Sequence, residues 1–311
     1  MSGPVLVTGA SGFVGRALVE RMCRERVVVA TSRDRAQVAA DAKWVPSPDF
    51  ELGTLGLPLG EVGAVVHLAA IAHVPAGASD RARRRVMRVN AEAPVEFARR
   101  AAAAGVRRFV FLSSVKALGE RSSAPLRPDA PAAPEDLYGE AKLAAERGLT
   151  AVARDTGLEV VIVRAPLVYG PGVKANFAQL VRWVACGRPL PLGAARNRRS
   201  LVSVWNLVDA LALCCDSPAA AGGAWHVTDG RSLSTRELVE AIGRAAGVRP
   251  RLWDVPPSLV RAALALCGRG AMARRLFDSL ELDDSATLAQ LSWRPPTSVD
   301  DALARTVRSL A

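Results

Sequence analysis

Residues 5–15 read Val-Leu-Val-Thr-Gly-Ala-Ser-Gly-Phe-Val-Gly, and this stretch decides the fold. The apolar residues 5–7 predict a parallel strand that is buried on both faces. Gly9 lets the chain turn sharply off that strand, Gly12 lets the backbone approach a pyrophosphate, and Gly15 lets the following helix pack closely on the strand. The helix N-terminus then offers free N–H groups to phosphate. A glycine turn without a ligand has the same pattern, so the motif needs support from the rest of the chain.

The composition is that of a globular protein. A chain of 311 residues with 50% hydrophobic content can bury a large core. The five Cys show no paired spacing apart from the adjacent Cys214 and Cys215, and no charged-then-apolar leader precedes residue 5. We therefore expect a reduced, cytoplasmic protein without a structural disulfide. No apolar run reaches the roughly 18 residues that a membrane span needs.

The net charge of +11 calls for an anionic ligand or a strongly solvated surface. The only dense basic run has no aromatic residues between its arginines, which are Arg81, Arg83, Arg84, Arg85 and Arg88. This run predicts a solvated helix face rather than a nucleic-acid site. A small molecule that carries phosphate is the anionic partner we expect.

Strands and helices alternate through roughly residue 165. Buried strands are predicted over 27–31, 64–70, 109–112 and 160–163, with a shorter one near 44–45. Helices are predicted over 81–104, interrupted around 90–94, and from 138 to about 155. This alternation predicts an α/β fold with a Rossmann-type doubly wound parallel sheet. No metal site is expected.

Beyond residue 170 helices dominate, over 176–186, 206–217, 234–246, 257–267 and 298–310. We expect a dinucleotide-binding domain over 1–170 and a smaller, mainly helical substrate lobe over 171–311. The chain is expected to cross back to the sheet near 200–217. Such a lobe would close over the carboxyl edge of the sheet, where ligands of these folds bind.

The residues after the second strand bear on the choice of dinucleotide. We expect NADP in preference to NAD, because Ser32 and Arg33 follow the strand and a basic side chain there can hold a 2′-phosphate. Asp34, which could accept from the ribose 2′-hydroxyl, is the observation that favours NAD. Two histidines follow near the next strand. His67, inside an apolar run, is predicted to be a core residue, and His73, just past it, is a candidate for substrate contact.

Tyr138 and Lys142 carry the strongest chemical signal. They lie four residues apart, on one face of the predicted helix, in a chain with only two Tyr and four Lys. A neighbouring ammonium favours the phenolate, so we expect Lys142 to lower the pKa of Tyr138 and to hydrogen-bond the nicotinamide ribose. Ser114, at the end of a strand, can donate to the substrate oxygen while Tyr138 moves the proton. Ser113 is the alternative hydroxyl.

These motifs resemble the extended branch of the short-chain dehydrogenase/reductase superfamily. The resemblance runs the full length, through residues 9–15, 67–70, 89–90, 113–114, Tyr138 with Lys142, and 164–172. It implies that the cofactor contacts are Gly9, Ser11, Gly12, Phe13, Val14, Gly15, Ser32, Arg33, Leu68, Ala69, Ala70, Tyr138, Lys142 and Pro166. It also implies UDP-sugar contacts at Ser113, Asn176, Leu190, Pro191, Leu192 and Arg199. Arg199 also has a simpler interpretation, as one arginine of an exposed loop.

One departure from the family narrows the reaction. Sugar-nucleotide 4,6-dehydratases of this group place Asp-Glu after the catalytic hydroxyl, whereas this chain has Val115 and Lys116. The acid/base pair for elimination is therefore absent. A C4 reductase and a C4 epimerase remain. The resemblance favours bacterial enzymes that reduce UDP-2-acetamido-2,6-dideoxy-4-hexulose to UDP-N-acetylquinovosamine for surface polysaccharide, with UDP-hexose or UDP-N-acetylhexosamine 4-epimerase as the alternative.

Two other classes of function stay open. A non-catalytic NADP-binding regulator would commonly have lost Tyr138 or Lys142, and a carbonyl reductase for non-sugar ketones would not need Arg199 or Asn176. The resemblance also implies a homodimer formed through helices at about 91–104 and 138–155, where the alanines of 101–104 would allow close approach.

Overall fold

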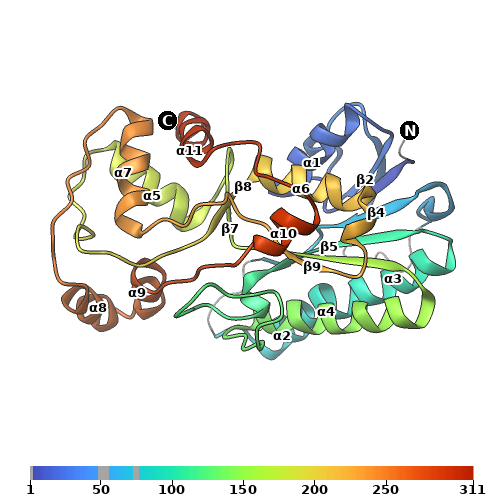
Figure 1. The fold of residues 1–311 in the computed structure, drawn as a ribbon, viewed down its shortest axis with the longest axis horizontal. Coiled ribbons are helices and arrows are strands. Elements are labelled where there is room, and N and C mark those ends of the chain that lie inside the picture. Colours follow the sequence, from blue (N-terminus) through green and yellow to red (C-terminus); the bar gives the residue numbers. More distant parts are fainter. Residues whose placement is uncertain (1–2, 48–55, 73–76, 311) are drawn as a thin grey trace.

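The computed structural model describes residues 3–47, 56–72 and 77–310. Its centre is a seven-stranded sheet in the order β3-β2-β1-β4-β5-β6-β9, and every pair of neighbours is parallel (Figure 1). The strands are β1 (Val5–Thr8), β2 (Val28–Ser32), β3 (Lys43–Pro46), β4 (Ala64–His67), β5 (Arg108–Ser114), β6 (Glu159–Ala165) and β9 (Ala224–His226). The strand order reverses between β1 and β4, and a ligand crevice is expected outside the carboxyl ends of these strands.

Helices cover both faces of this sheet (Figure 1). On one face lie α1 (Phe13–Cys23) and α6 (Val204–Asp216), which share a core with residues such as Val7 and Val110. On the other face lie α2 (Asp80–Met87), a π-helical turn (Arg88–Glu92), α3 (Ala93–Ala103) and α4 (Leu137–Thr156). Phe97, Phe109 and Leu149 are among the fully buried side chains of this second core.

A smaller lobe lies at one end of the sheet (Figure 1). Its helices are α5 (Ala175–Ala185), α7 (Thr235–Ala246), α8 (Pro257–Leu266), α9 (Gly270–Phe277) and α11 (Val299–Arg308). A separate core, which includes Phe177, Ile242 and Leu303, holds this lobe together. A two-stranded parallel sheet of β7 (Leu167–Tyr169) and β8 (Leu201–Ser203) lies between the lobe and the large sheet. The short helix α10 (Ser285–Gln290) packs against β9.

The parallel sheet and its alternating helices confirm the predicted fold class. The helix predicted from residue 138 is α4, which Asp136 caps by accepting from the Gly139 N–H and which ends at Gly157 with a φ of 75°. The helix predicted over 234–246 is α7, and its N-cap Ser234 forms a capping box with Glu237. Three short strands (β7, β8 and β9) and two short helices (α9 and α10) were not predicted. No helix in the described part of the chain is both long and apolar enough to cross a membrane.

Candidate active site

The turn after β1 has no room for side chains at two of its glycines. Gly9 has a φ of 67°, and a Cβ on it would lie 2.9 Å from the Ala69 backbone nitrogen. A Cβ on Gly15 would overlap the carbonyl oxygen of Gly9 and lie 2.9 Å from the Cα of Ala10. Helix α1 begins after Gly12 with no side-chain cap, so its first-turn N–H groups remain available at the end of the helix. These features fit the pyrophosphate of a dinucleotide.

The backbone after β4 is fixed beside this turn. The hydroxyl of Thr8 accepts from the N–H groups of Leu68 (3.2 Å) and Ala69 (3.3 Å). The amide of Asn90 makes two hydrogen bonds with the backbone of Ile71, at 2.8 and 2.9 Å. Asn90 lies in the π-helical turn that interrupts the predicted helix of 81–104. Residues 68–71 are therefore held rigidly at the carboxyl end of β4.

His67 is a core residue, as predicted. It is 2% exposed, and its Nδ1 hydrogen-bonds to the Thr8 hydroxyl at 3.0 Å. Burial, assisted by the charge of Lys142, lowers the pKa of His67 to about 3, so the ring is neutral at physiological pH. His73, the second candidate, lies outside the described residues.

Ser32, Arg33 and Asp34, which bear on the choice of cofactor, have different contacts at the end of β2. Ser32 is buried, and its hydroxyl donates to the Asp34 carbonyl (2.9 Å) and accepts from the Trp44 indole (3.0 Å). The Asp34 carboxylate accepts from the Ala36 N–H at 2.9 Å. Arg33 is exposed. The Ser32 hydroxyl thus stabilises the loop, while an acidic and a basic side chain both remain near the strand end.

Ser114 and Tyr138 lie on two segments that touch each other. Ser114 is the last residue of β5, is half-buried, and accepts from the Lys116 N–H at 3.2 Å. Tyr138 is the second residue of α4. Between them, a Cβ on Gly139 would overlap the carbonyl oxygen of Lys116, which shows how closely the first turn of α4 packs on the chain that follows Ser114.

Lys142 lies one turn after Tyr138 and is buried. Its Nζ donates to the Leu112 carbonyl at 2.8 Å and lies 5.8 Å from the centre of the Tyr138 ring. Nζ is also 4.4 Å from the centre of the Phe111 ring. Tyr138 and Lys142 therefore lie on one face of α4, as predicted. The Leu112 carbonyl, on the strand that also carries Ser114, orients the ammonium.

The pKa values of this pair differ from the expectation. Burial lowers the pKa of Lys142 to about 7, although Glu146 acts against this change. Burial and the nearby Asp136 carboxylate raise the pKa of Tyr138 to about 12. The predicted lowering of the phenol's pKa by Lys142 is thus not found in the ligand-free protein, because the loss of solvation outweighs an ammonium that is itself only partly charged.

The side chain of Ser113 points into the protein interior. It is 3% exposed, and its hydroxyl donates to the Glu146 carboxylate at 2.5 Å. Glu146 also accepts from the guanidinium of Arg164 at 3.0 Å and 2.6 Å, and Arg164 donates to the Pro128 carbonyl. Ser113 therefore stabilises a buried ion pair, and Ser114 is left as the hydroxyl at the strand end. Sequence reasoning missed Glu146, although its position one turn after Lys142 was visible.

The predicted substrate residues of the second lobe have different environments. Asn176 is exposed in the first turn of α5. Leu190 and Leu192 are buried in the core of the lobe, so only Pro191 of that stretch has a partly exposed side chain. The side chains of the two leucines pack inside the protein and the Leu190 backbone pairs with Arg251 and Trp253, so Pro191 is the residue of this stretch whose side chain could meet a ligand.

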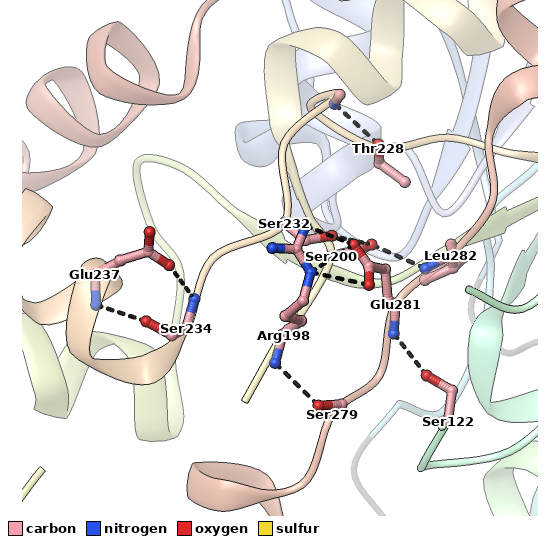
Figure 2. Close-up of polar contacts among 11 residues, drawn as sticks. Ser122, Arg198, Ser200, Thr228, Ser232, Ser234, Glu237, Ser279, Glu281 and Leu282 are labelled. Atoms are coloured by element: carbon pink, nitrogen blue, oxygen red, sulfur yellow. Dashed lines mark hydrogen bonds and ion pairs between the residues drawn. The ribbon is translucent and has the colours of Figure 1, made fainter. Parts of the chain in front are cut away.

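Arg199 is half-buried and held by its neighbours. Its guanidinium donates to the Asp278 carbonyl at 2.9 Å, and burial lowers its pKa while Asp278 and Glu120 act to raise it. The preceding Arg198 pairs with Glu281 at 2.9–3.0 Å, and its N–H donates to the Ser279 hydroxyl (Figure 2). Arg199 is thus fixed in a connected segment rather than in a loose loop.

Residues 279–283 connect this arginine with the chain that follows Ser114. The Ser122 hydroxyl accepts from the Glu281 N–H at 2.9 Å, and the Ser200 hydroxyl accepts from the Leu282 N–H at 2.9 Å (Figure 2). The backbone of 279–283 also pairs with residues 122–126 on one side and 198–200 on the other. The two halves of the candidate site are therefore joined through one C-terminal segment.

Among the described residues no group of three or more His, Cys, Asp or Glu side chains could hold a metal ion. The glycine turn, the fixed backbone of 68–71 and the Ser114, Tyr138 and Lys142 side chains together fit a nicotinamide dinucleotide. They can support hydride transfer coupled to proton transfer through a phenol.

Comparisons with known proteins agree with this arrangement. Residues 5–227 match the family described as "NAD dependent epimerase/dehydratase family". UDP-glucose 4-epimerase of Vibrio cholerae is 38% identical over 320 residues, which cover 99% of this chain and 96% of that protein. The structure of MoeE5 in complex with UDP-glucuronic acid and NAD is 26% identical, with a TM-score of 0.77 and coverage of 99% and 98%. UDP-glucose 4-epimerase of Thermotoga maritima with UDP-glucose has a TM-score of 0.78 at 21% identity and covers 98% of both chains, which shows the shared fold.

Proposed function

Because this chain belongs to the NAD dependent epimerase/dehydratase family, we propose that it is an NAD(P)-dependent oxidoreductase acting at C4 of a UDP-sugar, and in the first place a UDP-sugar 4-epimerase. The observation that carries this proposal is the placement of Tyr138 and Lys142 one turn apart on α4, against the strand end that bears Ser114. The 38% identity with a protein called UDP-glucose 4-epimerase, over almost the whole of both chains, supports the choice of reaction.

The dinucleotide would lie across the carboxyl ends of β1 and β4. The backbone and side chains of residues 9–15 would hold its pyrophosphate, and residues 68–70 and Pro166 would lie along it. When bound, the dinucleotide supplies the hydride acceptor and donor. NAD fits Asp34 at the end of β2, and the solved relative MoeE5 is a complex with NAD.

Three side chains would move and hold the proton. Tyr138 takes the proton of the C4 hydroxyl and later returns it, while Ser114 donates a hydrogen bond to the same oxygen. Lys142 favours the phenolate only in its ammonium form. Since burial lowers its pKa to about 7, an anionic ligand beside it would increase the charged fraction and make Tyr138 a better base.

Arg199 and Asn176 are the residues that would bind the diphosphate of the substrate. The planar guanidinium of Arg199 suits paired phosphate oxygens, and its fixed position means that little side-chain entropy is lost on binding. Leu190 and Leu192 would act through the shape of the lobe, whose core they help to fill. Pro191 would present its ring to the uridine.

A second candidate is the 4-ketoreductase that forms UDP-N-acetylquinovosamine with NADPH. Arg33, exposed at the end of β2, favours it, because a guanidinium there can bind a 2′-phosphate. The two candidates share Ser114, Tyr138 and Lys142. They differ in whether the cofactor stays bound through a full cycle or is exchanged at each turnover.

The experiment that separates them begins with the dinucleotide. The purified protein is denatured and any released dinucleotide is identified by mass spectrometry, and the native protein is then incubated with UDP-glucose or UDP-N-acetylglucosamine without added cofactor. Retained NAD together with formation of the C4 epimer supports the epimerase. Consumption of NADPH only with UDP-2-acetamido-2,6-dideoxy-4-hexulose supports the reductase. If the folded protein catalyses neither reaction, the proposal is wrong.

Tyr138→Phe tests the site itself. We expect turnover to fall by about 100-fold or more, the usual contribution of a positioned acid/base, with dinucleotide binding retained. Near-normal turnover would remove Tyr138 from the mechanism.

We also propose a homodimer in which α3 and α4 of two copies pack together. Within one copy these helices already approach closely, since a Cβ on Gly148 of α4 would lie 2.5 Å from a methyl group of Val95. A monomeric sedimentation profile at micromolar concentration would contradict this assembly.

A further inference from the structure

We propose that Lys116 is a positioning residue for the reaction: its ammonium ties the segment that follows Ser114 to Asp136, the N-cap of the helix that carries Tyr138. In this way Lys116 sets both the position and the charge environment of the phenol. The inference rests on the proposed function, and it assigns a role to a side chain outside the proposed catalytic residues Ser114, Tyr138 and Lys142.

The contacts of Lys116 join two parts of the chain. Its Nζ lies 2.5 Å from a carboxylate oxygen of Asp136 and 2.6 Å from a carboxylate oxygen of Glu120. Its backbone N–H donates to the hydroxyl of Ser114 at 3.2 Å. One residue thus contacts the catalytic hydroxyl through its backbone and the cap of the catalytic helix through its side chain.

Asp136 uses its two carboxylate oxygens for different partners. One accepts from the Gly139 N–H at 2.8 Å and caps α4, and the other receives the Lys116 ammonium. In the same turn, a Cβ on Gly139 would overlap the carbonyl oxygen of Lys116. The first turn of α4, which contains Tyr138, is therefore held against Lys116 by a charged contact and by close backbone packing.

The charges around Tyr138 come from two elements. Asp136, two residues before the phenol, raises its pKa, and Lys142 lies on the same helix. The connection after β5 contributes Lys116 and Glu120, and His67 of β4 is neutral. Lys116, Glu120 and Asp136 together carry a net charge of −1. Without Lys116 the charge would be −2, and the phenolate would be harder to form.

Three substitutions change this charge in a known order. Lys116→Met makes the cluster −2, Asp136→Asn makes it 0 while keeping an N-cap residue, and the double variant restores −1. We expect the apparent pKa of Tyr138 to rise in the first, fall in the second and return close to the wild-type value in the third. A change of one charge near a partly solvated phenol predicts single shifts of about half to one pH unit.

Two measurements follow Tyr138 independently. The pH profile of kcat/KM for alcohol oxidation reports the group that must lose a proton, and the Cζ resonance of ¹³C-labelled tyrosine reports the phenol directly without substrate. The chain has only two tyrosines, so Tyr138→Phe assigns the signal. Burial and Asp229 raise the pKa of the other, Tyr169, so it stays protonated over the same pH range.

Two control variants separate this role from general destabilisation. Lys43→Met removes an ammonium from an exposed pair with Glu61, at 3.6 Å, and should leave both titrations unchanged. Lys116→Arg keeps the charge and should retain the wild-type profile. If Lys116→Met does not fold, Asp136→Asn and Lys116→Arg still test the predicted directions.

The inference is overturned if the folded variants lose activity equally at every pH and the Tyr138 resonance titrates as in the wild type. This result would leave Lys116 with a structural role only. The proposed function fails separately, if Tyr138→Phe keeps its turnover. A shift of the resonance in the predicted order supports the inference even before the natural sugar is identified.

Discussion

Replacing Glu146 by Gln should destabilise the protein strongly, because it leaves a buried guanidinium without its counter-charge. The side chains of Glu146 and Arg164 are 4% and 9% exposed, and the shortest distance between them is 2.6 Å. The Ser113 hydroxyl donates to the same carboxylate. Gln has nearly the same volume, so the change removes the charge without opening a cavity.

The expected cost follows from burial. Removing one partner of a buried ion pair typically costs about 3–5 kcal/mol, since the remaining charge has already lost its hydration. The hydrogen bond from Arg164 to the Pro128 carbonyl persists and cannot neutralise that charge. For a chain of this size, a loss of 1 kcal/mol lowers Tm by roughly 2 °C, so we expect a decrease of about 6–10 °C.

Thermal and urea unfolding of the dinucleotide-free protein measure this loss. Asp155→Asn is the matched control on the same helix, where Asp155 pairs with Arg154 at 3.3 Å and both side chains are well exposed. That variant should lose less than about 1 kcal/mol. If Glu146→Gln unfolds within 1 °C of the control, the ion pair contributes little and the reasoning from burial is wrong.

Three other variants test other parts of the site. Gly15→Ala places a Cβ against the Gly9 carbonyl, and we expect a loss of about 1–3 kcal/mol together with weaker dinucleotide retention, measured by unfolding and by calorimetric titration. Lys142→Met should remove a pH dependence from the unfolding free energy of the dinucleotide-free protein. The Lys142 ammonium loses its proton at about pH 7 in the folded state and near pH 10.5 in the unfolded state. Between these values the unfolding free energy of the wild type therefore rises by roughly 1.4 kcal/mol per pH unit relative to that of the variant. A flat difference in unfolding free energy would refute the lowered pKa. Arg199→Met should raise KM for the UDP-sugar about 10- to 100-fold with little change in kcat, and an unchanged KM would exclude diphosphate binding by Arg199.

The sequence predicts the central strands of the large sheet well, because β1, β2, β4, β5 and β6 are almost completely buried. Runs such as residues 5–7 and 109–112 are apolar without alternation, as buried parallel strands require, and glycines or caps mark the ends of the helices. The interruption predicted around 90–94 is also real. It is a π-helical turn, and it places Asn90 against the backbone of Ile71.

The short elements could not be predicted in the same way. Strands β7, β8 and β9 have three residues each, too few for any periodicity, and long-range pairing rather than local pattern creates them. Helices α9 and α10 have eight and six residues, and neither has a side-chain cap. Their positions depend on the lobe and on β9, which a local pattern cannot show.

For the candidate site, the sequence identifies candidate residues by type and spacing, but it does not predict their environment. Tyr138, Lys142 and Ser114 stand out through residue type and spacing. The lowered pKa of Lys142 depends on burial against Phe111, and the inward direction of Ser113 depends on Glu146 and Arg164, which come from two other elements. Such effects require the positions of neighbours that are distant in the chain.

Residues 279–283 limit how the two halves of this protein can be exchanged with those of relatives. A chimaera that takes its first half from one parent and its second from another would separate Glu281 and Leu282 from residues 122–126, with which they pair. The smaller lobe is therefore coupled to the loop after Ser114 through its C-terminal segment. Recombination sites in engineered variants should leave these contacts intact.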